Sequence, residues 1–394
     1  MTEPVRPRGR FLVFGAPTIE DEEINEVADS MRAAWLGTGP KVARFEDLFA
    51  GYVGITNAVA LNSCTAALHL ALLAAGIGPG DEVIIPSLTF CATANAVIHA
   101  GARPVVADVD QRSMNLTGET VRRVVSPATR AIIPVHFAGR PCPMDEILML
   151  ARERDLVVIE DCAHAIETQI DGRHAGTFGD IGCYSFYATK NITTGEGGML
   201  VTERKDLADR VKVLGLHGMT TNAWRRYGDE GFKHYEVVAA GFKYNMMDLQ
   251  AAIGIHQLGR VAANWERRRI VWQRYNSGLA GLGLTLPADP DAGTRHALHL
   301  YTIQVAADVT GIERDEFLSH MTAEGIGVGV HYRSLTEHPF YQQAYGWRLG
   351  DCPTAERIGR QTVSLPLSPG LSPGDTADVV EAVRRVIGRA DAAS

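Results

Sequence analysis

Short apolar runs alternate with helical patterns between residues 57 and 203 of the chain. Several of these runs are apolar at every position, as in strands whose two faces are both covered by helices. Such alternation predicts an α/β domain with a mainly parallel sheet of seven strands. The runs are NAVAL (57–61), EVIIP (82–86), RPVVADV (103–109), RAIIPVHF (130–137), LVVIED (156–161), IGCYSFY (181–187) and GMLVTE (198–203).

The pattern differs on either side of this region. Residues 20–53 favour helices around the turn LGTGPK (36–41), and residues 246–282 favour a long helical stretch. A chain of 394 residues is too long for one simple core. We therefore expect a large α/β domain over 1–250 and a smaller α+β domain over 251–394. The smaller domain is expected to hold strands near 299–306 and 326–333 and helices near 314–324 and 373–389.

Composition excludes several classes of partner. The net charge is −8, the isoelectric point is near 5.9 and no basic block occurs, so nucleic acid and anionic membranes are not expected partners. The N-terminus lacks the long apolar core of a signal peptide. The six cysteines form no CxxC pair, which favours free thiols in a reducing cytoplasm over disulfides or a metal site.

Lysine is rare in this chain. Only six of the 38 basic residues are lysine, and one of them, Lys190, follows a strand-like run and precedes the glycine-rich turn TTGEGG. An amine can lose its proton and attack a carbonyl, whereas a guanidinium stays protonated. Lys190 is therefore a candidate nucleophile.

Other polar residues follow the same strands. Because ligands collect at the carboxyl ends of the strands in open α/β sheets, residues far apart in sequence are expected to share one rim. Each has a structural alternative: a helix cap, a paired carboxylate, a core aromatic or a surface lysine. Together, an amine, a carboxylate, a helix start for a phosphate and an aromatic platform suit pyridoxal phosphate. These residues include Asn62, Ser63, Thr65, Phe90, His136, Asp161, His164 and Lys190.

From about residue 11 to 388 the chain resembles the DegT/DnrJ/EryC1/StrS aminotransferases. These are pyridoxal phosphate enzymes of the aspartate-aminotransferase fold (fold type I), which aminate keto sugars on nucleotide carriers. The resemblance is carried by ten motifs in order. They are WLGTGPKVARFE (35–46), ALNSCTAALHLAL (60–72), GDEVIIPSLTFCATANAV (80–97), PVHFAGRP (134–141), IEDCAHA (159–165), SFYATKNITTGEGG (185–198), GFKYNMMDLQAAIG (241–254), HLY (299–301), GVHY (329–332) and SLPL (364–367).

The resemblance implies roles for the catalytic residues. Lys190 is similar to the Schiff-base lysine, and Asp161 to the partner of the pyridine nitrogen. Phe90 matches the aromatic residue stacked on the cofactor ring. His164 stands where many relatives carry Gln, and it is expected either to orient Asp161 or to face the phenolic oxygen of the ring.

The resemblance also implies a phosphate site shared between two subunits. Thr65 and Ser185 match hydroxyls on the phosphate, helped by the backbone at Cys64, where the family often has Gly. Asn245 matches an asparagine that reaches the phosphate from the other subunit, which implies a homodimer with shared active sites.

A subgroup signal lies in residues 214–258, which are similar to enzymes that aminate C4, notably the 4-amino-4-deoxy-L-arabinose aminotransferase. Residues 218–238 are interpreted as a loop over the nucleotide sugar, with Arg225 and Arg226 as candidate diphosphate ligands. His136 and His331 are further candidates for contact with substrate.

We therefore expect a ping-pong transfer of an amino group from L-glutamate to the C4 ketone of a dTDP- or UDP-linked keto sugar. The substrate would be a 4-keto-6-deoxyhexose or a 4-keto-pentose, and the product an amino sugar such as dTDP-4-amino-4,6-dideoxyglucose. The sequence leaves the pathway open between antibiotic biosynthesis, O-antigen and lipid modification. The alternatives are amination at C3 and a non-catalytic regulatory protein on the same fold. A sugar 3-dehydratase is disfavoured, since those enzymes replace the lysine with His.

Overall fold

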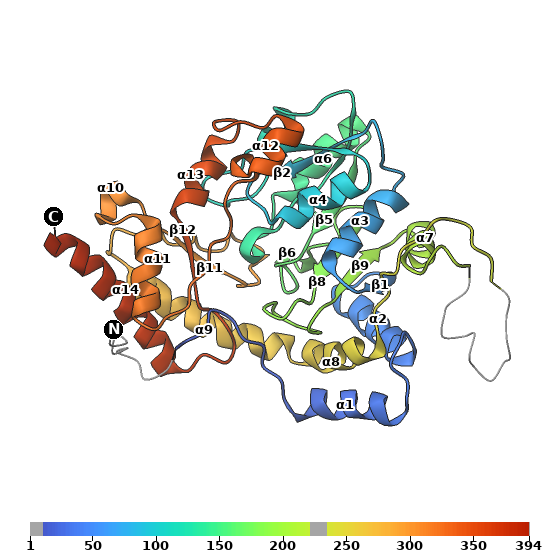
Figure 1. Ribbon diagram of the computed structural model, residues 1–394, viewed down its shortest axis with the longest axis horizontal. Coiled ribbons are helices and arrows are strands. Elements are labelled where there is room, and N and C mark those ends of the chain that lie inside the picture. The colour runs from blue at the N-terminus through green and yellow to red at the C-terminus, as the bar shows by residue number, and fades with distance from the viewer. Residues whose placement is uncertain (1–10, 221–234, 394) are drawn as a thin grey trace.

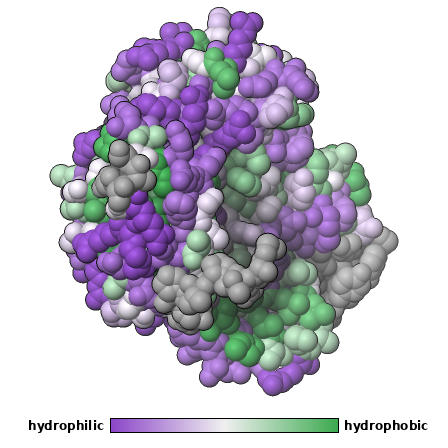
Figure 2. Space-filling model, turned by 60° about the vertical axis from the view of Figure 1, so that its left-hand side comes forward, coloured by the Kyte–Doolittle hydropathy of each residue, from purple (hydrophilic) through white to green (hydrophobic). Residues whose placement is uncertain are grey.

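The computed structural model describes residues 11–220 and 235–393 of the chain (Figure 1). Among these residues, no helix is long and apolar enough to cross a membrane. Hydrophilic residues cover most of the face seen in Figure 2, and hydrophobic residues gather in a central recess and in a patch towards its base.

A seven-stranded sheet forms the centre of the molecule, as predicted. Its order is β1-β9-β8-β5-β4-β2-β3. Only β9 runs antiparallel to its neighbours, so the carboxyl ends of the other six strands meet at one edge. Every strand falls within one of the seven apolar runs, give or take a residue. The strands are β1 (Asn57–Leu61), β2 (Glu82–Pro86), β3 (Arg103–Ala107), β4 (Thr129–Ile132), β5 (Val157–Asp161), β8 (Ile181–Ser185) and β9 (Gly198–Thr202).

Helices cover both faces of this sheet. Successive strand residues point to opposite faces, so Val83 and Ile85 pack on one side while Ile84 packs on the other. One face carries α3 (Cys64–Ala74), α4 (Cys91–His99) and α7 (Lys205–Gly215). The other carries α2 (Pro40–Val53), α6 (Met144–Arg154) and α8 (Asp248–Gly259). The helices α1 (Asp21–Arg32) and α5 (Gly118–Arg122) complete this part.

A second core lies around a two-stranded antiparallel sheet. It is formed by β11 (Tyr301–Gln304) and β12 (Thr362–Leu365), with α9 (Val261–Leu279), α11 (Arg314–Ala323) and α14 (Pro373–Ala393) packed on them. The strand near 299–306 and both helices are thereby confirmed. Smaller elements are β6 (Gln169–Ile170), β7 (Arg173–His174), β10 (Thr294–Arg295), α10 (Ala307–Thr310) and the 3₁₀ turns Phe137–Gly139 and Leu335–Glu337.

The strand expected near 326–333 is wrong. This segment makes only isolated bridges, at Ile326 and Gly329, and then turns towards the large sheet. Glycine at 325, 327 and 329 weakens strand formation, because it adds backbone entropy and no side chain to pack. The partner of β11 is β12, whose last two residues the sequence showed only as part of the motif SLPL.

Two segments after residue 250 pack with the large sheet. Helix α8 contributes Ile255 and Leu258 to a core shared with β1 and β9. Residues 335–358, which include α12 (Pro339–Tyr345) and α13 (Pro353–Gln361), join the core under α3 and α4. We therefore propose that the second unit begins within α9 and that the chain returns to the first unit before β12.

Candidate active site

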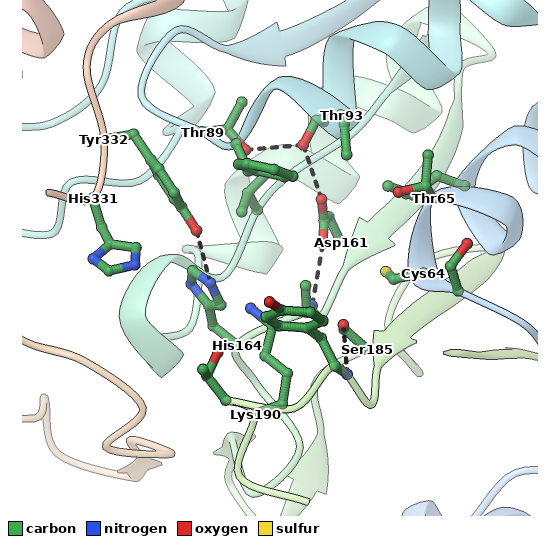
Figure 3. A pocket seen from close by; sticks show the side chains of 18 of the residues that line it. Cys64, Thr65, Thr89, Thr93, Asp161, His164, Ser185, Lys190, His331 and Tyr332 are labelled. Atoms are coloured by element: carbon green, nitrogen blue, oxygen red, sulfur yellow. Dashed lines mark hydrogen bonds between the residues drawn. The ribbon is translucent and has the colours of Figure 1, made fainter. Parts of the chain in front are cut away.

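A cavity of about 310 Å³ opens at the carboxyl edge of the large sheet (Figure 3). Segments far apart in the sequence supply its walls, as the strand-end argument predicts. Most of the candidate residues lie here together. Its walls include Cys64, Thr65, Phe90, Thr93, Asp161, His164, Ser185, Lys190, His331 and Tyr332.

Lys190 lies in the turn that follows β8. Its backbone N–H donates to the carbonyl of Tyr187 at 2.9 Å, and its side chain rises into the cavity. No hydrogen bond to another described residue holds its amine. Burial lowers the pKa of this amine to about 8, although nearby Cys64 and Asp161 oppose the shift. An appreciable neutral fraction near neutral pH makes the amine fit for nucleophilic attack and proton transfer.

Gly198, at the end of the glycine-rich turn after Lys190, packs too closely against α3 to carry a side chain. A Cβ on Gly198 would lie 2.4 Å from the carbonyl carbon of Ser63 and 2.5 Å from the nitrogen of Cys64. Only glycine therefore lets β9 begin against the first turn of α3. This contact fixes the start of α3 beside the end of β8, where Ser185 lies.

We expect Lys190 in the cofactor-free protein to become reactive towards a small acylating reagent as the pH rises through about 8. The reason is that only the neutral amine is nucleophilic, and burial lowers the pKa. Mass spectrometry of Lys190 peptides across a pH series measures the midpoint. Because the charge of Asp161 raises this pKa, the Asp161→Asn variant should show a lower midpoint. A Lys190 midpoint above pH 10 would show that burial does not lower the pKa of this amine.

Asp161 ends β5 and is almost fully buried. Its Oδ2 accepts a hydrogen bond from Thr93 Oγ1 at 3.0 Å, and its Oδ1 accepts one from the Ala163 N–H at 3.1 Å. Burial raises the pKa of this carboxyl despite both bonds and the nearby Lys190. A cationic group placed in the cavity would favour the ionised form, so the residue fits a protonated pyridine nitrogen.

Thr93 was missed by the sequence analysis. It lies in the first turn of α4, and its hydroxyl also meets that of Thr89 at 2.9 Å. The signal that could have found it is a hydroxyl in the helix that starts directly after β2, at the same edge as Asp161.

The two ring nitrogens of His164 bond groups other than Asp161. Its Nδ1 accepts from the Ala138 N–H at 3.2 Å, and its Nε2 lies 3.1 Å from the hydroxyl of Tyr332. Of the two roles expected for His164, orienting Asp161 is wrong, since Thr93 and Ala163 bind that carboxylate. That it faces the phenolic oxygen of the cofactor stays a prediction. Burial, followed by the charge of Lys190, holds the pKa of His164 well below its ordinary value, so the ring is neutral.

The start of α3 forms a cradle on another side of the cavity. Ser63 is the helix cap, since its Oγ accepts from the Ala66 N–H at 3.1 Å. Cys64 and Thr65 are the first two helical residues, whose amides have no carbonyl one turn earlier to bind. With the hydroxyls of Thr65 and Ser185 on the same wall, this arrangement suits a phosphate group.

Phe90 stands at the mouth of the cavity. It precedes α4, makes no side-chain cap, and is 57% exposed. Its ring centroid lies 5.9 Å from that of Tyr332. This exposure leaves a ring face free for a flat ligand.

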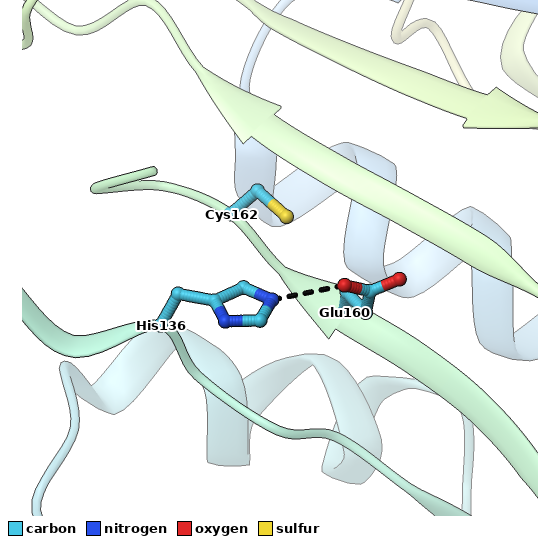
Figure 4. A group of neighbouring side chains, drawn as sticks. All are labelled: His136, Glu160 and Cys162. Carbon is cyan, nitrogen blue, oxygen red and sulfur yellow. Dashed lines mark hydrogen bonds and ion pairs between the residues drawn. The ribbon is translucent and has the colours of Figure 1, made fainter. Parts of the chain in front are cut away.

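The prediction that His136 contacts substrate is wrong. The side chain is fully buried, its Nδ1 accepts from the Cys142 N–H, and its Nε2 lies 2.9 Å from Glu160 (Figure 4). Glu160 in turn accepts from the amides of Gly176, Phe178 and Gly179. His136 and Glu160 lie close to Cys162 as in a metal site. Glu160 instead binds the loop that precedes β8, and His136 joins Glu160 to the amide of Cys142.

The four remaining candidates divide into one that lines the cavity, one that lies elsewhere and two that fall outside the described residues. His331 lines the cavity, where its Nδ1 bonds Ser364 Oγ at 2.8 Å and burial lowers its pKa to about 4. Asn245 lies in a separate surface hollow, bonded to Lys243 and Thr38. Arg225 and Arg226 fall in 221–234, outside the described residues.

A buried ion pair supports the turn that carries Lys190. Arg268 Nη2 pairs with Glu167, and both side chains are 1% exposed. Glu167 also accepts from Asn191 Nδ2 at 2.7 Å, and Asn191 Oδ1 meets His299 Nδ1 at 2.9 Å. Asn191 follows Lys190, so these bonds hold the backbone of the lysine. Neither the pair nor His299 was singled out from the sequence.

The fold and the site together define a pyridoxal phosphate-dependent aminotransferase of fold type I. The model of the DegT/DnrJ/EryC1/StrS aminotransferase family matches residues 17–384, and the chain belongs to that family. The resemblance noted from the motifs is thereby confirmed.

Individual relatives agree with this assignment. The chain is 47% identical, over 98% of its length and all of the relative's, to the spore coat polysaccharide biosynthesis protein SpsC of Bacillus subtilis. Spr1654 of Streptococcus pneumoniae, a proposed sugar aminotransferase, has been solved in its PLP form. It has a TM-score of 0.89 at 30% identity over 96% of this chain and 99% of its own. DesV of S. venezuelae, solved with a ketimine intermediate, has a TM-score of 0.84 at 33% identity. The match covers 95% of this chain and 98% of DesV.

Proposed function

We propose that the protein transfers an amino group from L-glutamate to the C4 ketone of a nucleotide-linked keto sugar, with dTDP or UDP as carrier. A sugar substrate is supported by the relatives Spr1654 and SpsC, whose names refer to a sugar and a polysaccharide. The choice of C4 rests on the similarity of residues 214–258 to enzymes that aminate this position. Amination at C3 is the second candidate, since the cavity itself does not distinguish the two ketones.

The observation that carries the proposal is the Lys190 amine, which bonds none of the described residues, in the same cavity as the buried carboxyl of Asp161. Burial lowers the pKa of this amine to about 8. Bound pyridoxal phosphate supplies an electron sink for the carbanion at the substrate carbon. Lys190 binds the cofactor and moves the proton at the reacting carbon, because its amine changes charge near neutral pH. Asp161 keeps the pyridine nitrogen protonated through its negative charge.

The remaining residues of the cavity wall bind and orient the cofactor and the substrate. Thr65 and Ser185, with the amides at the start of α3, hold the phosphate, and Phe90 covers the ring face. His331 is neutral in its buried position and can donate or accept a hydrogen bond with the sugar. Arg225 and Arg226 are proposed to bind the diphosphate.

We propose a homodimer in which Asn245 completes the phosphate site of a second copy. In one chain Asn245 does not line the cavity of Lys190, and it opens instead onto a surface hollow. That hollow also contains Trp35, Thr38 and Lys243. A cytoplasmic location is favoured by the six unpaired thiols, most of them buried.

The proposal is tested by following the visible absorption of the cofactor-loaded enzyme. L-Glutamate should convert the cofactor to its aminated form and bleach the visible band. A dTDP- or UDP-linked 4-keto sugar should then restore the band, whereas matched 3-keto sugars should not. Restoration by 3-keto sugars alone would move the reaction to C3. Failure of every keto sugar, after normal bleaching by glutamate, would contradict the sugar assignment.

A further inference from the structure

Tyr187 and Glu196 line the same cavity as Lys190, and both belong to the segment that joins β8 to β9. Beyond the paired strands, a further backbone bond joins the Phe186 N–H to the Gly197 carbonyl at 2.9 Å. Tyr187 directly follows the first of these residues, and Glu196 directly precedes the second. The two residues therefore lie opposite each other in register where the hairpin opens.

Both side chains lie towards the open side of the cavity. Side chains two positions apart along a strand point to the same face, so Tyr187 follows Ser185 on the cavity wall. Tyr187 is 47% exposed and Glu196 is exposed, whereas Ser185 is half-buried. With the cofactor phosphate at Ser185, a second ligand that enters above the cofactor meets Tyr187 and Glu196.

The glycine-rich turn fixes the backbone of Glu196. Its carbonyl accepts hydrogen bonds from Thr194 Oγ1 at 2.6 Å and from Gln250 Nε2 at 2.7 Å. The preceding Gly195 has a φ of 79°, a conformation that glycine adopts without strain. A Cβ on Gly197 would collide with Thr194 Oγ1, so a larger residue there would displace the first of these bonds. The turn thus holds Glu196 at one place on the cavity wall.

The functional groups of the pair are left for a ligand. Within residues 11–220 and 235–393, neither the Glu196 carboxylate nor the Tyr187 hydroxyl bonds another residue, and only backbone atoms of the two do so. A fixed backbone that presents an unbonded carboxylate to a cavity is the arrangement expected of a binding group. The tyrosine ring beside it offers an apolar surface.

Charge decides which part of the proposed substrates the pair binds. L-Glutamate and the nucleotide diphosphate are both negatively charged, and the Glu196 carboxylate repels them. The hydroxyls of a sugar ring are neutral donors, and one carboxylate accepts two of them through charge-assisted bonds. The C–H face of the same ring is apolar and packs on an aromatic side chain. A carboxylate next to a tyrosine ring therefore suits the sugar.

We propose that Tyr187 and Glu196 bind the sugar ring of the substrate. The Tyr187 ring packs on the apolar face of the sugar, and the Glu196 carboxylate accepts hydrogen bonds from two neighbouring hydroxyls. With the ketone at C4, these are the hydroxyls at C2 and C3. The inference rests on the proposed function, which supplies the nucleotide-linked keto sugar, and it makes both residues determinants of substrate specificity.

The test is the binding of dTDP-glucose and UDP-glucose to the cofactor-loaded enzyme, measured by isothermal titration calorimetry beside dTDP and UDP alone. These nucleotide sugars keep the ring hydroxyls and have no ketone, so they bind without being aminated. Glu196→Gln should raise the Kd of the nucleotide sugar about tenfold and change that of the free nucleotide less than twofold. Tyr187→Leu should raise the Kd of the nucleotide sugar about fivefold, whereas Tyr187→Phe, which keeps the ring, should change it less than twofold.

Two controls show that the variants are otherwise intact. L-Glutamate should bleach the visible band of each variant at the wild-type rate, because neither residue is assigned to that half of the reaction. Glu266→Gln, which changes a surface carboxylate paired with Arg269, should leave every Kd unchanged.

Three results would overturn the inference. An unchanged Kd of the nucleotide sugar in Glu196→Gln would show that the carboxylate does not bind the sugar. Equal weakening of the nucleotide sugar and the free nucleotide would place the effect on the nucleotide or on the fold. Either result would leave the proposed function standing. If the wild-type enzyme bound neither nucleotide sugar, the proposed substrate class would fail as well, so the two failures are distinguishable.

Discussion

Lys190→Ala should abolish transamination, with a loss in kcat of about 1,000-fold or more, while the protein keeps its fold. The side chain ends in the cavity and its amine has no hydrogen bond to another described residue, so its removal breaks no structural contact of the amine. What is lost is the nucleophile and the group that moves the proton. Steady-state kinetics with glutamate and the best keto sugar measure the effect, and circular dichroism checks the fold.

Two further variants test whether the loss of activity comes from the missing neutral amine at position 190. Lys190→Arg keeps a positive charge but supplies no neutral amine, and it should be as inactive as Lys190→Ala. Lys205→Ala removes an exposed lysine that pairs with Asp209 on the surface, and it should leave kcat unchanged. Activity of Lys190→Arg within tenfold of the wild type would mean that charge, not nucleophilicity, is what the site needs.

Asp161→Asn should lower kcat by about 100-fold or more and weaken cofactor binding, because the pyridine nitrogen loses the charge that keeps it protonated. The cofactor-free protein should respond in the opposite sense. Burial raises the pKa of Asp161 in the folded state, so its ionised form destabilises the empty site at pH values above its unfolded pKa. The neutral amide removes that cost, and the thermal midpoint of the cofactor-free variant at pH 8 should be equal or higher.

The control for this variant is Asp206→Asn, which changes a surface carboxylate paired with Arg204. It should alter neither kcat nor cofactor affinity. If Asp161→Asn destabilised the cofactor-free protein at pH 8 and left kcat unchanged, Asp161 would be a structural residue, and the assignment of the cofactor nitrogen to this wall would be wrong.

The large sheet could be predicted from the sequence because each strand is covered on both faces and is apolar throughout, as in EVIIP at 82–86. The second unit was harder to predict from the sequence. The pairing of β11 with β12 joins residues about sixty positions apart and is a tertiary choice that no local pattern contains. The segment 326–333 has the apolar residues of a strand, but its glycines reduce it to isolated bridges.

The residues of the active site likewise include some that the sequence could predict and some that it could not. Lys190, Asp161 and Thr65 could be predicted because strand ends and helix starts converge by topology. His136 also ends up near a strand end, but it faces the covered side, and a single position does not reveal which face it takes. Thr93 and Tyr332 owe their places to how α4 and the segment after Gly329 pack, so the sequence showed only that they belong to motifs.

The measurement that tests the account most directly is borohydride reduction of the cofactor-loaded enzyme followed by peptide mapping. Reduction fixes the cofactor to the amine that carries it, and mass spectrometry locates the added group among the six lysines. The account predicts one modified residue, Lys190, and loss of the modification when glutamate is added first. A cofactor found on another lysine, or on none after full loading, would contradict it.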